Sequence, residues 1–380
     1  MSKPLKINIL LYRPGLGGGD RVVAIYAEYL RRRGHDVILT ALKPAPVAFK
    51  HQAAHFLRKG RLQTNAYSAT HYDHLNIPVR LSKDPYVIDD GDLEDADVLL
   101  ATFWRTAEWA TEISPAKGAK AYFVQNYESA FPYSDPARVG ETYRAPLKKI
   151  VISNWLDDLM RTKFGETPVA RIANSVDTKQ FTAPPRRKND IPCVGFLYGD
   201  SPIKGVDVTV RAIDQIRRSI PNLNVVAFGS TAAGDGAPLP RGCEYHFEPA
   251  QDKIRDIYAK CDVWMCGSRV EGFHLPPMEA MACRCPVVST SVGGPADVIE
   301  NGRQGYLVPV EDAGQLAEKT LSILQASNEA WLKMSDAAYA TATRYSWDDA
   351  GALFEAALRD VADGAAVQGA GMSPADGAAG

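Results

Sequence analysis

The sequence contains no long hydrophobic run. Its apolar stretches all fall short of the roughly 18 consecutive residues needed to cross a bilayer. The apolar run nearest the N-terminus, residues 7–11, is also too short for a signal peptide, and no cleavage pattern follows it. These absences argue against an integral membrane protein, and we expect a cytoplasmic one.

The chain also lacks an excess of either charge. Its 43 Lys and Arg residues are balanced by 45 Asp and Glu residues, which gives a formal net charge of -2. Because no global charge attracts the chain to nucleic acid, we expect no nucleic-acid partner.

Cysteine is absent from the first half of the chain, and no spacing of Cys and His matches a zinc site. A reducing compartment keeps such thiols unpaired. We therefore expect structural, reduced cysteines and no bound metal. The six are Cys193, Cys243, Cys261, Cys266, Cys283 and Cys285.

The chain is long enough, and has the right composition, to form two domains. Its 380 residues exceed the usual size of one hydrophobic core, and 46% hydrophobic with 23% charged residues is an ordinary globular composition. Residues 7–12 read as a strand, a glycine loop and a helical pattern follow, and residues 37–40 return to a strand. The same pattern restarts at residues 193–197. The predicted fold class is α/β, with two Rossmann-like parallel-sheet domains facing across an interdomain cleft.

Proline and charge mark the boundary between these domains. The stretch 182–190 holds two prolines and several charges that neither a helix nor a central strand accommodates, so we predict a hinge there. The predicted units are an N-terminal Rossmann-like domain (1–181), the hinge, a C-terminal Rossmann-like domain (191–345), a helix (346–362) that packs back on the N-terminal domain, and a disordered tail (363–380).

The glycine loop is a candidate phosphate site. Gly17, Gly18 and Gly19 lie between a predicted strand and a predicted helix, where backbone amides and the helix dipole favour an anion. The spacing is not the dinucleotide fingerprint, and no acidic ribose ligand follows the second strand, which disfavours an NAD enzyme. The alternative is that these glycines only permit a tight turn with positive φ.

Two carboxylates, Glu271 and Glu279, are separated by seven residues. Glu271 precedes a glycine in a predicted loop, whereas Glu279 lies in a strongly helix-forming run. An ionised carboxylate accepts hydrogen bonds from two sugar hydroxyls, which makes the pair a candidate sugar site. The alternative is a surface acid beside an acid at a helix N-terminus.

With its surroundings, this pair resembles the signature of family 4 of the retaining glycosyltransferases, which have the GT-B fold. The resemblance extends to Lys204-Gly205, to Asn174-Ser-Val-Asp177 followed by Phe181, and to the glycine loop with Asp20-Arg21. The matches follow the family's order over roughly residues 6 to 360.

The resemblance implies a nucleoside diphosphate sugar donor bound by the C-terminal domain (191–345), with the N-terminal domain (1–181) on the acceptor side. It also implies a saccharide or lipid-linked glycan acceptor, and no cofactor or metal. It implies that Glu279 binds the ribose, that Glu271 contacts the transferred sugar, and that Lys204 neutralises the diphosphate. The donor pocket would be lined by Gly205, Gly272, Phe273, His274 and Leu275.

The chain departs from the family in three places. No arginine precedes Lys204 in residues 190–203, so Arg21 or Arg269 is a candidate to serve the phosphates instead. Arg284 stands where the family usually has glycine, which we interpret as a harmless exposed substitution. Gln125 and Asn126 occupy the place of a histidine that faces the donor sugar, and they are candidate sugar or acceptor contacts.

Other functions stay open from sequence alone. A nucleotide-sugar epimerase of the same architecture would act on the donor without an acceptor, and a nonenzymatic sugar-nucleotide sensor would only bind it. The basic and apolar stretch 49–61 is either a peripheral contact with the inner membrane face or a solvated acceptor-side loop. Our leading hypothesis is hexosyl or deoxyhexosyl transfer in envelope or exopolysaccharide biosynthesis.

Overall fold

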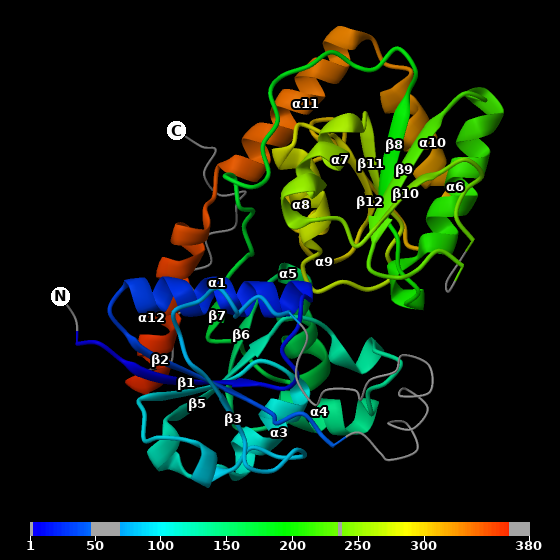
Figure 1. The fold of residues 1–380 in the computed structure, drawn as a ribbon. Coiled ribbons are helices and arrows are strands. Elements are labelled where there is room, and N and C mark those ends of the chain that lie inside the picture. The colour runs from blue at the N-terminus through cyan, green and yellow to red at the C-terminus, as the bar shows by residue number, and fades with distance from the viewer. Residues whose placement is uncertain (1–2, 47–68, 235–237, 365–380) are drawn as a thin grey trace, which may run out of the picture.

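The computed structural model describes residues 3–46, 69–234 and 238–364, which form two α/β domains (Figure 1). The stretch 49–61 and residues 365–380 of the expected tail lie outside the described residues. Each domain is built around a parallel sheet, so the predicted pair of Rossmann-like domains is confirmed.

The N-terminal domain contains a seven-stranded sheet in the order β3-β2-β1-β4-β5-β6-β7, all parallel. Ile7, Ile9 and Leu10 of β1 are fully buried, as expected for a parallel sheet with both faces covered. The strands are β1 Lys6–Leu11, β2 Asp36–Ala41, β3 Val79–Leu81, β4 Val98–Ala101, β5 Ala119–Val124, β6 Lys148–Val151 and β7 Ala170–Arg171, and the helices are α1 Gly18–Arg32, α3 Trp104–Glu112, α4 Pro136–Arg144 and α5 Asn154–Leu159.

The C-terminal domain contains a six-stranded parallel sheet in the order β10-β9-β8-β11-β12-β13. Its strands are β8 Cys193–Leu197, β9 Asn224–Gly229, β10 Glu244–Phe247, β11 Val263–Cys266, β12 Val287–Thr290 and β13 Gly305–Val308. Its helices are α6 Val206–Ser219, α7 Ile254–Lys260, α8 Leu275–Ala282, α9 Gly293–Val298, α10 Ala313–Leu324 and α11 Asn328–Thr343.

The strand orders determine where ligands fit. In each sheet the chain works outward in both directions from its first strand, so the order reverses between β1 and β4 and between β8 and β11. Open α/β sheets bind ligands outside the carboxyl ends of the strands at such switch points. The glycine loop follows β1, the turn with Lys204 follows β8, and Glu271 follows β11. The candidate residues therefore lie at both switch points.

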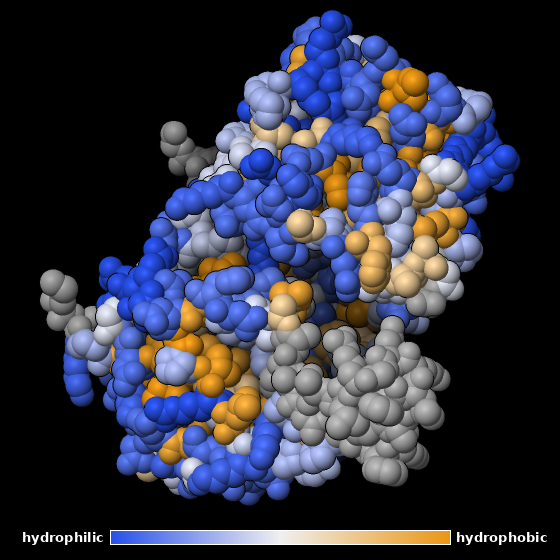
Figure 2. Space-filling view, in the orientation of Figure 1, coloured by the Kyte–Doolittle hydropathy of each residue, from blue (hydrophilic) through white to orange (hydrophobic). Residues whose placement is uncertain are grey.

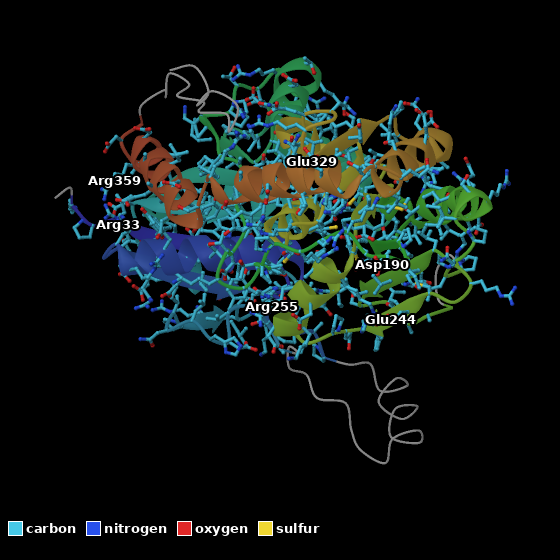
Figure 3. The ribbon with its side chains drawn as sticks, turned by 90° about the horizontal axis from the view of Figure 1, so that it is seen from above. Arg33, Asp190, Glu244, Arg255, Glu329 and Arg359 are labelled. Atoms are coloured by element: carbon cyan, nitrogen blue, oxygen red, sulfur yellow. The ribbon has the colours of Figure 1, made fainter. Side chains whose placement is uncertain are left out.

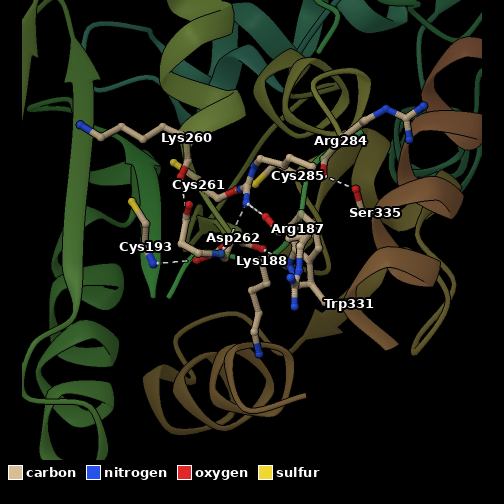
Figure 4. Close-up of polar contacts among 12 residues, drawn as sticks. Arg187, Lys188, Cys193, Lys260, Cys261, Asp262, Arg284, Cys285, Trp331 and Ser335 are labelled. Atoms are coloured by element: carbon tan, nitrogen blue, oxygen red, sulfur yellow. Dashed lines mark hydrogen bonds and ion pairs between the residues drawn. The ribbon is translucent and has the colours of Figure 1, made fainter. Parts of the chain in front are cut away.

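The segment 182–190 is tied to the C-terminal domain from Arg186 onward (Figure 4). The Arg186 guanidinium donates to the Asp262 carboxylate (3.0 Å) and to the carbonyls of Ala259 (2.8 Å) and Cys261 (2.5 Å). Lys188 Nζ donates to the Leu324 carbonyl at 2.7 Å. Because Asp262 is fully buried, its carboxylate needs the hydrogen bond from the Arg186 guanidinium.

Helix α12 (Trp347–Ala362) follows the C-terminal domain in sequence but lies beside α1 of the N-terminal domain (Figure 1). The rings of Tyr26 and Phe354 stack with centroids 4.1 Å apart. Arg33 and Arg359, at the same end of the molecule in Figure 3, both bond Glu355. The chain thus crosses between the domains twice.

The expectation that Arg284 is exposed is wrong. Its side chain is 14% exposed and donates to the Ala183 carbonyl at 3.1 Å. It also pairs with Asp336 and lies over the Tyr339 ring at 4.3 Å. Its φ of +63° falls in the left-handed region, which favours the glycine usual in the family.

All six cysteines are free thiols, and five of them are buried. Within the described ranges, no helix combines the length and apolar character that crossing a membrane requires.

Candidate functional site

A cavity of about 460 Å³ lies between the two domains, in the recess between the lobes seen in Figure 2. The N-terminal domain contributes the start of α1 and the residues after β5. The C-terminal domain contributes the turn after β8 and the loop leading into α8. The lining includes Gly18, Gly19, Gln125, Asn126, Asn174, Lys204, Glu271, Gly272, Phe273, His274 and Leu275.

Glu271 and Lys204 form an ion pair in this cavity. Lys204 Nζ lies 2.9 and 3.2 Å from the two carboxylate oxygens of Glu271, and Ser268 Oγ donates to the same carboxylate at 2.9 Å. Burial alone would raise the pKa of Glu271, but His274 and Lys204, together with the hydrogen bond from Ser268, lower it below its ordinary value. Glu271 is therefore ionised at neutral pH.

His274 lies next to this pair, with Nε2 3.7 Å from a Glu271 oxygen. Burial lowers the pKa of His274 to about 4, so the imidazole is neutral at neutral pH. A neutral ring suits hydrogen bonding.

Three buried polar atoms of cavity-lining residues have no hydrogen-bond partner within the part of the chain that the structure describes. They are Gln125 Oε1, Asn174 Oδ1 and His274 Nδ1. Buried polar atoms are rarely left unpaired, so three such atoms on residues that line one cavity favour a polar ligand beside them. Asn174 is an addition to the residues chosen from sequence, where its segment appears only as a family match. The sequence offered one signal for it, a polar amide side chain in the segment that precedes the hinge.

Glycines allow the close approaches that form this cavity. A Cβ at Gly272 would lie 1.8 Å from the Gln125 carbonyl oxygen across the cleft, so only glycine permits the two backbones to meet. Gly205, which follows Lys204, has a φ of +55°, and a Cβ there would lie 1.8 Å from the Gly267 carbonyl oxygen. The position of Lys204 thus depends on the glycine next to it.

The glycine loop starts α1. Gly17 is the N-cap, and Gly18 and Gly19 belong to the first turn. None of the three has a positive φ, so the alternative that they only permit a positive-φ turn is wrong. The adjacent Asp20 accepts from the Gly15 amide and the Tyr72 hydroxyl, both at 3.1 Å, and burial raises its pKa to about 6.

Glu279 and Arg21 do not line the cavity but bond each other across the domains. Arg21 Nη1 donates to Glu279 Oε1 at 2.8 Å, and the Tyr258 hydroxyl donates to Glu279 Oε2 at 2.8 Å. Burial raises the pKa of Glu279, while Arg21 and Tyr258 oppose that effect.

Arg269 is also engaged away from the cavity. Its two terminal nitrogens each lie 2.9 Å from the Asp207 carboxylate, and Nη1 also donates to the Pro202 carbonyl at 2.6 Å. The pair with Arg269 lowers the pKa of Asp207 to about 2. Arg269 therefore fixes the turn that ends at Lys204.

A second cavity of about 630 Å³ adjoins the first within the N-terminal domain. Both cavities share Gly19, Gln125, Asn126, Phe131 and Tyr133. The second adds aromatic and polar walls, whose residues the sequence did not single out because they come from separate loops: Tyr12, Arg13, Phe103 and Glu128.

Among residues 3–46, 69–234 and 238–364, no group of three or more His, Cys, Asp or Glu side chains is placed to hold a metal ion.

Residues 188–326 match the family described as "Glycosyl transferases group 1". The D-inositol 3-phosphate glycosyltransferase of Mycobacterium avium (strain 104) is 28% identical over 172 residues, 42% of this chain and 39% of that protein. The N-acetyl-alpha-D-glucosaminyl L-malate synthase of Bacillus anthracis is 37% identical over 75 residues, 20% of each chain. The chain thus spans about two fifths of the first of these relatives.

Solved structures match nearly the whole chain. Anabaena Alr3699/HepE in complex with UDP-glucose has a TM-score of 0.68 at 16% identity, covering 94% of this chain and 100% of that one. Sucrose-phosphate synthase from Thermosynechococcus elongatus has a TM-score of 0.69 at 17% identity, covering 95% and 100%. The chain therefore has the GT-B fold, and its C-terminal domain matches the glycosyl transferases group 1.

Proposed function

We propose that the protein is a retaining, metal-independent glycosyltransferase. It moves a hexosyl or deoxyhexosyl unit from a nucleoside diphosphate sugar to a saccharide or lipid-linked glycan. The observation that carries this proposal is the pair of adjoining cavities, one of which is lined by the ion pair of Lys204 with the buried Glu271 and by residues with three unpartnered polar atoms. Two substrates need two chambers that meet where the reaction occurs.

The chemistry of the walls supports the assignment of the chambers. In the interdomain cavity, the Lys204 ammonium offsets the charge that develops on the departing diphosphate. Glu271, Gln125 and Asn174 offer acceptor oxygens to sugar hydroxyls. In the second cavity, aromatic rings offer flat apolar faces to an acceptor.

The transfer step balances without a protein base. The bond from the sugar C1 to the diphosphate oxygen breaks, a bond from C1 to the acceptor oxygen forms on the same face, and the acceptor proton passes to the departing diphosphate oxygen. Gln125 and Asn126, in the wall shared by both cavities, cannot take a proton at neutral pH. His274 is neutral but buried on the donor side, where it orients the sugar.

Similar proteins suggest the first ligands to test. A solved structure of HepE holds UDP-glucose, and one of a mutant of S. aureus TarM holds UDP with alpha-GlcNAc-glycerol. A role at the cytoplasmic face in polysaccharide assembly rests on analogy with the family.

The test begins with a thermal-shift screen of UDP, GDP and dTDP sugars, because a ligand that binds the native state raises its melting temperature. The best donor is then incubated with saccharide acceptors in EDTA and followed by NMR. A product with the donor's anomeric configuration supports the proposal, and an inverted product contradicts it. A changed sugar on the nucleotide without acceptor would indicate the epimerase instead.

The Glu271→Gln variant should lose at least about a hundredfold in transfer rate, because it removes a buried charge beside the reacting sugar. Glu300→Gln, at an exposed carboxylate paired with Arg303, is the matched control and should keep full activity. Full activity in Glu271→Gln would remove that residue from the site.

A further inference from the structure

The second cavity contains a cation that no carboxylate balances. Among the described residues, Lys204 and Arg13 are the two lysine or arginine side chains that line the adjoining cavities. Lys204 pairs with Glu271, whereas Arg13, exposed in the loop after β1, forms no ion pair with any carboxylate in the described ranges. Arg13 lines the second cavity and not the interdomain one, so its charge is directed to the acceptor side.

An aromatic wall supports the Arg13 guanidinium. Its Cζ lies over the Tyr12 ring, 5.1 Å from the centroid, and that ring stacks on Phe103 with centroids 5.3 Å apart. Both rings line the same cavity. A guanidinium that stacks on a ring keeps its N–H edges free, and two parallel N–H groups match the two oxygens of a carboxylate or phosphate.

The two acids of the second cavity have other partners. Asp20 accepts from the Gly15 amide and the Tyr72 hydroxyl, both at 3.1 Å. Glu128 is buried, and burial raises the pKa of its carboxyl to about 8, so that this side chain is mostly uncharged at neutral pH. The Arg13 charge is therefore left for a ligand.

A second aromatic pair lies where the two cavities meet. Phe131 and Tyr133 line both cavities and stack with centroids 5.4 Å apart. Tyr133 is 74% exposed, so its ring offers an open face at this junction. Exposed apolar faces beside a cavity mark ligand-binding grooves, and such faces suit the apolar side of a sugar ring.

We propose that the acceptor carries an anionic group, a carboxylate or a phosphate, and that Arg13 binds this group in the second cavity. This inference rests on the proposed function, which supplies an acceptor but leaves its charge open. The aromatic rings contact the body of the acceptor, and Arg13 selects for its charge. A neutral acceptor would leave the guanidinium with water, whereas an oxyanion forms two charge-assisted hydrogen bonds with it.

The test compares acceptor probes that differ in one group. The wild type is first saturated with the nucleoside diphosphate that stabilises it most, so that an added anion does not bind at Lys204. Methyl glycosides with a hydroxyl, a carboxylate or a phosphate at C6 are then titrated and followed by NMR. Gluco, galacto and manno rings separate charge from ring configuration, and acetate and inorganic phosphate test the anion without a ring.

We expect an anionic glycoside to bind at least about tenfold more tightly than its neutral form, the effect of hydrogen bonds to a charged group. The tighter of the two anions identifies the group as carboxylate or phosphate. Arg13→Met should remove this preference and leave the affinity for the neutral glycoside unchanged. Arg13→Lys keeps the charge without the planar fork and should keep only part of the preference.

The control for these variants is Arg32→Met, because Arg32 lies in the same domain and pairs with the exposed Asp348. It should keep the full preference for the anion. All variants should bind the nucleoside diphosphate as the wild type does, since Arg13 does not line the interdomain cavity. If Arg13→Met does not fold, Arg13→Gln takes its place with the same expected loss.

The outcomes separate the inference from the proposed function. If the wild type binds no nucleoside diphosphate, the proposed function falls, and the inference falls with it. If the nucleotide binds but no anionic probe binds more tightly than its neutral form, only the inference is overturned. A preference that persists in Arg13→Met, or an equal loss for neutral and anionic glycosides, would overturn it as well.

Discussion

At the scale of single residues, the Lys204–Glu271 pair decides the charge of the interdomain cavity. In Lys204→Met, the buried Glu271 carboxylate would face an incoming diphosphate without a counterion, and two like charges in a poorly hydrated site repel. We expect the affinity for the nucleoside diphosphate to fall at least about tenfold, which is about 1.4 kcal/mol, by calorimetry.

Lys253→Met provides the control, because its side chain is 67% exposed in the same domain. An unchanged affinity in Lys204→Met would show that the phosphates bind elsewhere.

Glu128, in the wall of the second cavity, predicts a pH dependence of stability. Burial raises the pKa of its carboxyl to about 8, although Tyr122 and the Trp104 amide both donate to it. The folded state therefore keeps a proton that the unfolded chain releases above its ordinary pKa. The stability that this proton provides is present at low pH and is lost as the pH rises from about 4.5 to about 8.

Glu128→Gln mimics the protonated form and keeps an oxygen for both donors. Between pH 5 and pH 8 in urea denaturation, the wild type should lose about 3 to 4 kcal/mol of stability relative to this variant. An identical pH dependence for both proteins would contradict the buried, protonated state of Glu128.

Residue patterns predicted part of the site. Glu271, Lys204, Gly272 and His274 line one cavity together, as the ordered motifs implied. The partners of Arg21 and Arg269 were not predictable, because spacing along the chain does not determine which side chain meets which across a cleft. The same holds for aromatic residues drawn from separate loops.

At the scale of elements, the sequence of the stretch 182–190 predicts its lack of regular structure but not its attachment to the C-terminal domain. Its prolines predict the absence of helix and strand, and none is present there. Its attachment to the C-terminal domain depends on which carbonyls lie exposed at the ends of α7 and α10, and that follows only from the folded arrangement.

Two adjacent arginines in this stretch allow a matched test. Arg186 stacks over Trp331 at 4.7 Å and pairs with the fully buried Asp262, whereas the Arg187 side chain is exposed. Arg186→Met should destabilise the protein by about 3 to 5 kcal/mol because it leaves a buried carboxylate without its cation. Arg187→Met should change the free energy of unfolding by less than about 0.5 kcal/mol. Equal effects in urea denaturation would contradict the anchoring role of Arg186.

At the scale of the whole molecule, the two crossings of the chain lie together. The Ser175 hydroxyl, in the first crossing, donates to the Tyr345 carbonyl in the second at 2.5 Å. Because both connections pass the same point, a relative rotation of the domains about it would strain neither.

Gly272 sets how far such a rotation can close the cleft. In Gly272→Ala, the new methyl would fall 1.8 Å from the Gln125 carbonyl oxygen, so the domains must move apart. We expect a larger radius of gyration in small-angle scattering and lost transfer activity. For the scattering comparison, Gly18→Ala is the control, since the nearest atom to its methyl would be Leu275 Cδ1 at 4.0 Å. An unchanged radius in Gly272→Ala would show that the loops yield instead.

The contact at Gly272 is made by main-chain atoms on both sides, and this separates two properties that redesign usually alters together. On the proposed function, exchanging side chains on either wall should change which sugar fits, while the closed spacing of the lobes stays the same. We therefore expect donor specificity and closure to vary independently, so a library that randomises the walls while retaining Gly272 should sample new substrates on an unchanged frame.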